Sequence, residues 1–342
     1  MSAGKLLRGV LRIIAALFVV VVIVFVIFSI SPAPGAAVIR YMFDRGSADL
    51  AMRIESFKPN GITSIKDEHY RANDDIHLDV YFPEEIASAG KALPTVVWVH
   101  GGGWLSGSKE DAAVYYQSLA KEGFTVIPID YTIAPAGQYP LPVEQVNDAL
   151  AYIVANAERF HVDKDRIFIA GDSAGAQITS QIAMVITGPT DYAVKVQIRP
   201  SIAPKQLRGV ILHCGFYDLP KFVESAEISP VRFLRLGMST MIWAYMGKRS
   251  PDDLDLRKMS AMYNATPAFP ATFISGGNAD PLTDGHSRPF AEKLNSLSVP
   301  VTTVFYPADH QPSLGHEYQF DLNLEDSRAT LKKTAEFIRQ RQ

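Results

Sequence analysis

The pattern of apolar residues separates an N-terminal segment from the rest of the chain. Residues 13–30, "IIAALFVVVVIVFVIFSI", form an apolar run without a single charged side chain. As a helix, eighteen residues would span about 27 Å, close to the thickness of a bilayer's hydrocarbon core. The apolar core of a cleaved signal peptide is usually shorter, about 7–15 residues. We therefore predict a membrane anchor within residues 1–34. A cleaved signal is the alternative, because the small residues of "SPAPGAA" follow.

The basic residues before this run predict its orientation. Lys5, Arg8 and Arg12 all precede it. Positive charge flanking a membrane helix favours the cytoplasmic side, so we expect a single pass with the N-terminus in the cytoplasm and the body outside it. Cleavage would instead release a secreted or periplasmic body. Residues 35–60 are predicted only as a connecting segment, Pro-rich where it follows the anchor.

Residues 61–342 alternate between strand-like and helix-like patterns. The runs "ITSIKDEHY" and "IHLDVYF" predict an antiparallel pair. Six further β-rich runs follow, separated mostly by helical patterns: "PTVVWVH", "FTVIPIDY", "RIFIAG", "LRGVILHCG", "PATFISGG" and "VTTVFYP". Near-continuous apolar strands alternating with helices predict an α/β fold, with a mostly parallel sheet covered by helices on both faces. Residues 216–269 break the alternation and predict a helical cap insertion, either a lid over a pocket or a packing subdomain.

Composition excludes several classes of function. Hydrophobic residues make up 47% of the chain and charged residues 20%, so a large core can form. The net charge of −3 gives no electrostatic reason to expect a nucleic acid partner. Cys214 is the only cysteine, which excludes an intrachain disulfide, a redox pair and a thiolate zinc site. We predict no metal and no cofactor, and the sequence does not indicate the oligomeric state.

The segment "IFIAGDSAGAQ" carries the clearest chemical signal. It contains G-x-S-x-G around Ser173, between a predicted strand and a predicted helix. A nucleophilic serine must project from a sharp turn, so the residues two before and two after it must be small. The helix that begins behind Ser173 would direct its positive end toward developing negative charge. Ser173 is therefore the candidate nucleophile.

A serine nucleophile needs a base and an orienting carboxylate, which should follow it in the chain. Asp280 comes first after the strand of "FISGGNADPLTDG" and precedes a proline, so we favour it over Asp284, a candidate helix cap. Asp218 is a weaker third option.

Three later histidines compete for the role of base, His286, His310 and His316, and His213 is interpreted as a core residue. His316 and His310 lie in the expected position, after the last strand. We favour His316, in "LGHEYQF", because its aromatic neighbours can fix the loop, whereas His310 lies in a polar and apparently exposed stretch. His286 comes too early in the chain, and His213 lies inside a strand.

Three consecutive glycines follow the strand "TVVWV", in "HGGGW". Acyl transfer passes through a tetrahedral oxyanion, which needs fixed N–H donors at about 2.7–3.1 Å. Backbone without side chains can turn its amides inward beside a substrate. We predict an oxyanion hole made by the amides of Gly102, Gly103 and Ala174.

Together, "HGGGW" and "GDSAGA" resemble the hormone-sensitive-lipase-like group of α/β-hydrolase esterases, over residues 94–342. The resemblance implies a metal-free serine carboxylesterase for short- to medium-chain acyl esters. "DPL" at residues 280–282 matches the group's acid motif, and "YTIAP" at residues 131–135 is similar to its "YRLAP" turn. Ala176 replaces a usual glycine, and "HEYQF" stands where His-Gly-Phe is usual.

The sequence therefore predicts a membrane-anchored serine carboxylesterase whose partners are a small acyl ester and a membrane. An amidase or deacetylase of the same mechanism is the nearest alternative. A non-catalytic binding protein on a hydrolase scaffold is the alternative from another class.

Overall fold

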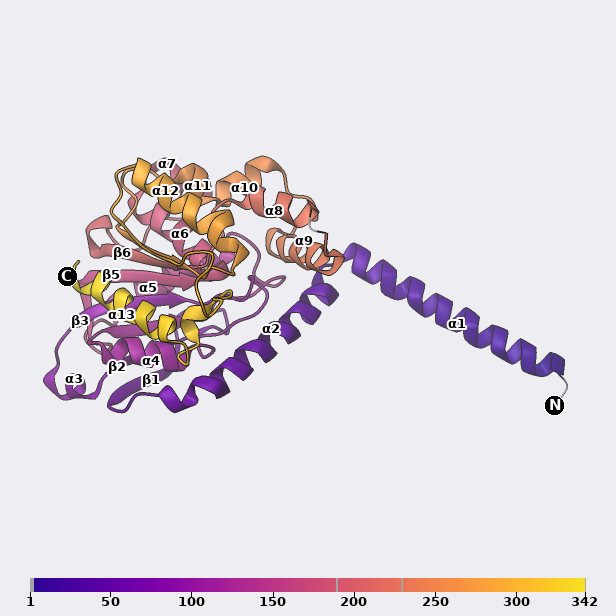
Figure 1. Ribbon diagram of the computed structural model, residues 1–342, viewed down its shortest axis with the longest axis horizontal. Helices are drawn as coiled ribbons and strands as arrows, with labels where there is room; N and C mark the ends of the chain where they lie inside the picture. The colour runs from indigo at the N-terminus through magenta and orange to yellow at the C-terminus, as the bar shows by residue number, and fades with distance from the viewer. Residues whose placement is uncertain (1–2, 189, 229, 342) are drawn as a thin grey trace.

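The computed structural model describes residues 3–188, 190–228 and 230–341 (Figure 1). The N-terminal helix α1, Ala3–Ile30, projects away from a compact α/β body. Its segment Leu7–Ile30 has a mean hydropathy of 3.5, and none of its most apolar window is buried within the described chain. An apolar helix that packs on nothing is consistent with a membrane anchor or a signal sequence.

Among the described residues, eight strands form one sheet in the order β1-β2-β4-β3-β5-β6-β7-β8. The strands are β1 Ile62–His69, β2 His77–Pro83, β3 Leu93–Val99, β4 Thr125–Ile129, β5 Val162–Asp172, β6 Leu207–His213, β7 Thr272–Gly276 and β8 Val301–Phe305. β1 pairs antiparallel with β2, and β2 with β4. The six strands from β4 to β8 in this order are parallel. The predicted α/β fold is confirmed, including the antiparallel pair at its start.

Helices cover both faces of the sheet. α4 Ala113–Lys121 and α13 Glu325–Arg339 pack on one face, in a cluster with Val96 and Trp98 of β3. On the other face, Val97 and Val99 of the same strand join a second cluster. That cluster includes residues of α5 Leu141–Ala155, α6 Ser173–Thr187, α7 Thr190–Val196 and α12 Arg288–Ser296. A short helix, α3 Glu84–Ala89, links β2 to β3. Burial on both faces explains why the parallel strands read as continuous apolar runs.

The predicted insertion after β6 is helical, as expected. Four helices occupy it: α8 Leu219–Ile228, α9 Arg232–Met246, α10 Asp253–Met259 and α11 Ala261–Asn264. Trp104, from the "HGGGW" loop, stacks on Tyr245 of α9 with ring centroids 4.7 Å apart. The cap is therefore packed directly onto the loop that follows β3.

The segment predicted as a connection, residues 35–60, is largely a helix. α2 covers Ala33–Ile54 and is followed by a short 3-10 turn at Glu55–Phe57. Its inward side chains recur at spacings of three and four residues, with Ala36 and Ile54 fully buried at its two ends. The interpretation as a mere linker missed this helix. Arg40, Gly46 and Ser47 on or beside the inward stripe dilute its hydrophobic pattern.

Candidate active site

Ser173 lies at the turn from β5 into α6. Its φ of 50° is in the left-handed region, which a residue with a side chain rarely adopts. A Cβ at Gly171 would collide with the Gly175 backbone, and a Cβ at Gly175 would collide with the Val99 and His100 carbonyls. The two glycines of G-x-S-x-G are therefore required by backbone contact, in the way that the motif predicts.

The structure brings Ser173, His316 and Asp280 into one hydrogen-bonded chain. His316 Nε2 lies 3.0 Å from Ser173 Oγ, and its Nδ1 lies 2.9 Å from Asp280 Oδ2. Asp280 follows β7 and is buried, while His316 follows β8, with 37% of its side chain exposed. Asp280 Oδ1 also accepts a hydrogen bond from the Leu282 amide, which fixes the carboxylate. With Nδ1–H donating to Asp280, Nε2 is left to accept a proton from Ser173.

His310 is not part of this chain. Its Nε2 pairs with Asp326 Oδ2 of α13 at 3.0 Å, and its ring packs on Tyr306. Only 25% of the His310 side chain is exposed, less than for His316. The reason for placing His310 second, its exposure, was therefore wrong, although the structure leaves it away from Ser173. A carboxylate from the terminal helix is thus the hydrogen-bond partner of His310.

The remaining histidine candidates lie in the core. His213 is buried against Trp98, its Nδ1 lies 2.6 Å from Ser275 Oγ, and burial lowers its pKa to about 3. His286 lies in a π-helical turn, Thr283–Ser287, and burial lowers its pKa to about 4. Both stay neutral at ordinary pH, so neither carries a charge into the site.

The two other aspartates have structural contacts. Asp284 pairs with Arg288 at 2.8 Å across one turn, rather than capping a helix as predicted. Asp218 Oδ1 accepts hydrogen bonds from the Lys221 amide and the Tyr263 hydroxyl. Asp280 is the carboxylate that reaches His316 among these three.

The glycine loop after β3 presents two amides to the site. Gly102 and Gly103 have φ of 90° and 59°, which favour glycine. In the described part of the chain, no acceptor takes a backbone hydrogen bond from the amides of Gly102 or Gly103. Ala174 lies in the first turn of α6, where amides lack a partner within the helix. The oxyanion hole predicted from Gly102, Gly103 and Ala174 stays a prediction, supported by two glycine amides without a backbone acceptor among the described residues.

The helix α2 holds the same loop from outside. Arg40 donates from Nε to the Leu105 carbonyl at 2.6 Å and from Nη2 to the Ala134 carbonyl at 2.9 Å. The Ser106 hydroxyl donates to Asp44 Oδ1 at 2.5 Å. Within the loop, the amides of Leu105 and Ser106 both donate to the Gly102 carbonyl. Sequence reasoning missed Arg40 and Asp44. Their spacing of four residues, on one face of a helix that also carries Ala36 and Phe43, is the signal that could have found them.

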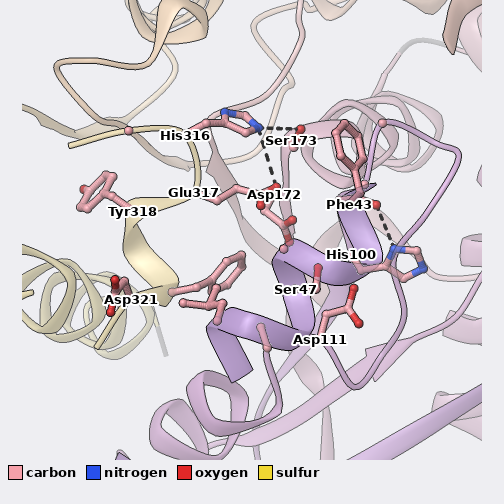
Figure 2. Close-up of a pocket in the computed structure, with 18 of the residues that line it drawn as sticks. Phe43, Ser47, His100, Asp111, Asp172, Ser173, His316, Glu317, Tyr318 and Asp321 are labelled. Carbon is pink, nitrogen blue, oxygen red and sulfur yellow. Dashed lines mark hydrogen bonds and ion pairs between the residues drawn. The ribbon is translucent and has the colours of Figure 1, made fainter. Parts of the chain in front are cut away.

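A cavity of about 530 Å³ opens above Ser173. Its apolar lining includes Phe43 and Leu50 on α2, Phe216 after β6 and Met241 on α9, and further apolar residues come from α4 and from the segment after His316. In Figure 2 the His316 imidazole points at Ser173, and Phe43 and Ser47 border the same cavity. A Cβ at Gly103 would collide with the Met241 methyl group, so the glycine loop is also in contact with the cap. Helices thus border the cavity on its sides, and the loops after β3 and β5 form its base.

A pair of carboxyl groups lies beside the triad residues. Burial and the neighbouring Glu317 raise the pKa of Asp172 well above its ordinary value, although Trp98 Nε1 donates to it at 2.8 Å. Glu317 Oε1 lies 3.7 Å from His316 Nε2. Glu317 has a φ of 58°, in the left-handed region, at the position where the family resemblance has glycine. The departure from His-Gly-Phe therefore sets a carboxylate beside the imidazole at some cost in backbone strain.

The environment of His316 favours the protonated imidazole by raising its pKa. Burial lowers its pKa, but Cys214, Asp280 and Glu317 raise it, and the net pKa lies well above its ordinary value. Burial raises the pKa of the Cys214 thiol to about 11, so Cys214 is neutral at ordinary pH. Among the described residues, Cys214, Asp280 and His316 form a group with metal-ligand spacing. A neutral thiol is a poor metal ligand, and two of the three groups already bond each other.

Comparisons with known proteins agree on the fold and the family. The BD-FAE family model matches residues 78–294, more than half of the chain. Carboxylesterase NlhH of Mycobacterium tuberculosis is 29% identical over 250 residues, which are 71% of this chain and 71% of that protein. Arylacetamide deacetylase of Bos taurus is 29% identical over 192 residues, 53% of this chain and 44% of that protein. The chain thus spans 71% of the length of the first of these curated relatives and 44% of the length of the second.

A solved structure shows the same architecture. Esterase B from Lactobacillus rhamnosis superposes with a TM-score of 0.76 at 18% identity, covering 90% of this chain and 95% of that one. At this identity the likeness concerns the fold. The match to the family model is the finding that shows the family, because it runs from β2 into α12, over more than half of the chain, and includes both glycine motifs. The chain belongs to the BD-FAE family and has the α/β-hydrolase fold of the esterases that it resembles.

Proposed function

We propose that this protein is a serine carboxylesterase that forms an acyl-enzyme on Ser173. The observation that carries the proposal is the hydrogen-bonded chain from Ser173 Oγ through His316 to Asp280 Oδ2. The esterase names of its relatives support the same class of reaction. Family membership alone would not suffice, because the fold hosts many activities.

In acylation, Ser173 Oγ attacks the ester carbonyl carbon while His316 Nε2 accepts the hydroxyl proton. The tetrahedral oxyanion receives hydrogen bonds from the amides of Gly102, Gly103 and Ala174. Asp280 holds the imidazole by its Nδ1–H and stabilises the imidazolium. When the intermediate collapses, the C–O bond to the alcohol breaks and His316 gives the proton to the leaving oxygen.

Deacylation repeats these steps with water. His316 Nε2 takes a proton from a water molecule, whose oxygen attacks the acyl carbonyl. The bond to Ser173 Oγ then breaks, Ser173 recovers the proton and the carboxylic acid leaves. This route requires no metal and no cofactor.

The dimensions of the site support short- to medium-chain acyl esters as substrates. The cavity of about 530 Å³ falls within the usual range for small-molecule pockets. Phe43, Phe216 and Met241 give it apolar walls on the sides that face the acyl group. A longer acyl chain would not fit within the cavity and would have to extend out of it past the cap helices.

The location of the enzyme follows from α1. We propose that α1 is a retained, single-pass anchor, with Arg8 and Arg12 on the cytoplasmic side and the catalytic body on the other. A secreted or periplasmic body after signal cleavage is the alternative. Protease added outside sealed vesicles of inverted orientation should spare the body, whereas digestion there would contradict the proposed orientation.

The proposed function is tested by covalent labelling and turnover. The full-length protein in detergent should react with a fluorophosphonate probe and hydrolyse p-nitrophenyl butyrate. Ser173→Ala should abolish both, with an unchanged melting temperature to show that the fold persists. A folded wild-type protein that neither labels nor hydrolyses esters would favour a binding protein on this scaffold and overturn the proposal.

The leaving group separates esterase from amidase or deacetylase. The mechanism is the same for both, but amide hydrolysis requires protonation of a poorer leaving group. A matched pair of substrates with one acyl group, a phenyl ester and the corresponding anilide, should give a much larger kcat/KM for the ester. The reverse ratio would assign the protein to the amidases.

A further inference from the structure

The start of α9 presents an exposed apolar surface. The exposed fractions of Ile228, Phe233 and Leu236 are 75%, 59% and 57%. Val231 and Leu234, in the same nine-residue stretch, are also about half exposed. We call these five side chains the α9 face. Large apolar residues gathered on one surface mark an interaction site more often than a solvated one.

The α9 face lies at the point where the anchor leaves the body. Arg249, just after α9, donates from Nη1 to the Ser29 carbonyl of α1 at 2.8 Å. Thr240 of α9 is in contact with Gly35 at the start of α2. Figure 1 shows α9 beside the junction of α1 and α2. A helix that spans a bilayer therefore ends against the helix that carries the α9 face.

The charges around the α9 face are basic. Residues 228–249 contain Arg232, Arg235, Lys248 and Arg249 and no carboxylate. Arg232 and Arg235 alternate with the apolar residues and are exposed. Exposed carboxylates lie on both sides of this segment, Glu224 and Glu227 before it and Asp252 and Asp253 after it, and Lys248 pairs with Asp255, so the basic charges among the apolar residues are those of Arg232 and Arg235. Basic residues among large apolar ones are typical of helices that lie in the headgroup region of a membrane.

We propose that the α9 face docks into the headgroup region of the same bilayer that α1 crosses. This inference rests on the proposed anchoring by α1. The bilayer is the occupant that the position favours, because α1 already brings lipid to this edge of the body. Met241, in the C-terminal half of α9, lines the cavity above Ser173. The docked α9 would then be the single helix between the lipid and the site. Docking should therefore raise the rate of hydrolysis most for esters that are dissolved in the bilayer.

Depth measurement tests the docking directly. Cys214 is buried, so Leu236→Cys offers one reactive thiol for an environment-sensitive dye. Val194→Cys is the control, because the side chain of Val194 is 67% exposed and α7, which carries it, lies away from α1 in Figure 1. The full-length protein is reconstituted into phosphatidylcholine–phosphatidylglycerol vesicles that carry nitroxide lipids. We expect the dye at 236 to be quenched and the dye at 194 to remain bright.

Each other outcome has a defined meaning. Flotation with the vesicles reports the anchor separately, and fluorophosphonate labelling reports the proposed activity. An anchored, labelled protein whose dye at 236 is as bright as that at 194 would overturn the docking. A dye at 236 that is shielded equally in lipid-free detergent would indicate a second copy of the chain on this face, and would overturn it too.

Substrate choice gives an independent test. The variant Phe233→Ser/Leu234→Ser/Leu236→Ser should hydrolyse a water-soluble butyrate ester at the wild-type rate. Its kcat/KM for a vesicle-dissolved ester should fall by about tenfold, because the body would no longer be held at the lipid surface. The matched variant Met52→Ser/Val194→Ser, which also removes exposed apolar side chains, should keep both rates. An equal loss on both substrates, or none on either, would contradict the inference.

Discussion

The strand ends and the covering helices contribute to this site in different ways. Ser173, Asp280 and His316 each follow a strand of the parallel sheet, where three loops meet at one edge. α2 and α9 contribute no member of the hydrogen-bonded chain, but they line the cavity and hold the glycine loop. The chemistry is thus fixed by the sheet, and the shape of the site by helices that are far apart in the sequence.

This difference has a physical origin. A nucleophile, a base and an acid need side chains of particular types at backbone turns of particular geometry, so they leave local motifs. A residue that lines the cavity needs only a side chain of suitable volume in contact with its neighbours, which many residue types can supply. Substitutions at the strand ends should therefore stop the reaction, whereas those in the helices should change its rate and selectivity.

The largest effect is expected at His316. His316→Ala should lower kcat for p-nitrophenyl butyrate by about 10⁴-fold or more, because Ser173 then lacks its base. His310→Ala removes an imidazole from the same loop and should leave kcat within about threefold of wild type, because His310 pairs with Asp326 instead. An inactive His310→Ala with an active His316→Ala would show that the base is wrongly assigned.

The next effect is expected at Arg40, a positioning residue. Arg40→Ala removes two hydrogen bonds to the backbone around the glycine loop and should lower kcat by about ten- to a hundredfold, with a smaller change in KM. Arg45→Ala, on the same helix, removes only a contact with the exposed Tyr41 hydroxyl and should be neutral. If Arg40→Ala changed only the melting temperature, α2 would be a structural brace without influence on the oxyanion hole.

A smaller effect is expected at the wall. Phe43→Ala enlarges the cavity beside Ser173 and should shift the ratio of kcat/KM for octanoate over butyrate esters upward by about fivefold. Met52→Ala, further along α2 and 71% exposed, should leave the ratio unchanged. A uniform loss across acyl lengths would indicate that Phe43 supports the loop rather than selects the substrate.

The smallest effect concerns pH. The reaction needs neutral His316, so kcat/KM should fall as pH drops through the pKa of that group. Asp280 and Glu317 raise this pKa, while burial opposes them. Glu317→Gln removes one negative charge and should lower the pKa of His316. The fall of kcat/KM on the acid side of the pH profile, the acid limb, should therefore move to lower pH. Asp321→Asn, which also removes a carboxylate from the cavity lining, should not move it. A limb that stays in place or moves to higher pH in Glu317→Gln would exclude this electrostatic role.

The sequence was sufficient for the sheet and for the residues at its edge. Continuous apolar runs predicted the parallel strands, and G-x-S-x-G predicted the turn at Ser173, because each depends on neighbours within a few residues. The environment of His310 could not be predicted in this way, since its partner Asp326 comes from the terminal helix. The roles of Ser173, Asp280 and His316 stay predictions until the variants are measured.

α2 shows where such reasoning stops. Its inward residues include Arg40 and Ser47, which are polar because they contact a loop and a cavity rather than a core. A helix of this kind lacks the wide apolar stripe by which amphipathic helices are recognised. The roles of Arg40 and Asp44 become visible only in the structure. There Arg40 contacts the carbonyls of Leu105 and Ala134, and Asp44 contacts the hydroxyl of Ser106.

The short connection between α1 and α2 also fixes the distance between the end of α1 and the cavity. α1 ends at Ile30 and α2 begins at Ala33, so no flexible spacer separates the anchor from the cavity wall. Phe43 follows Ile30 by 43 − 30 = 13 residues, which at 1.5 Å per residue puts the wall within about 20 Å of the end of the anchor. In the anchored form that we propose, the height of Ser173 above the lipid would be set by a helix length, and inserting or deleting residues in "SPAPG" would raise, lower or rotate the entire site relative to the membrane.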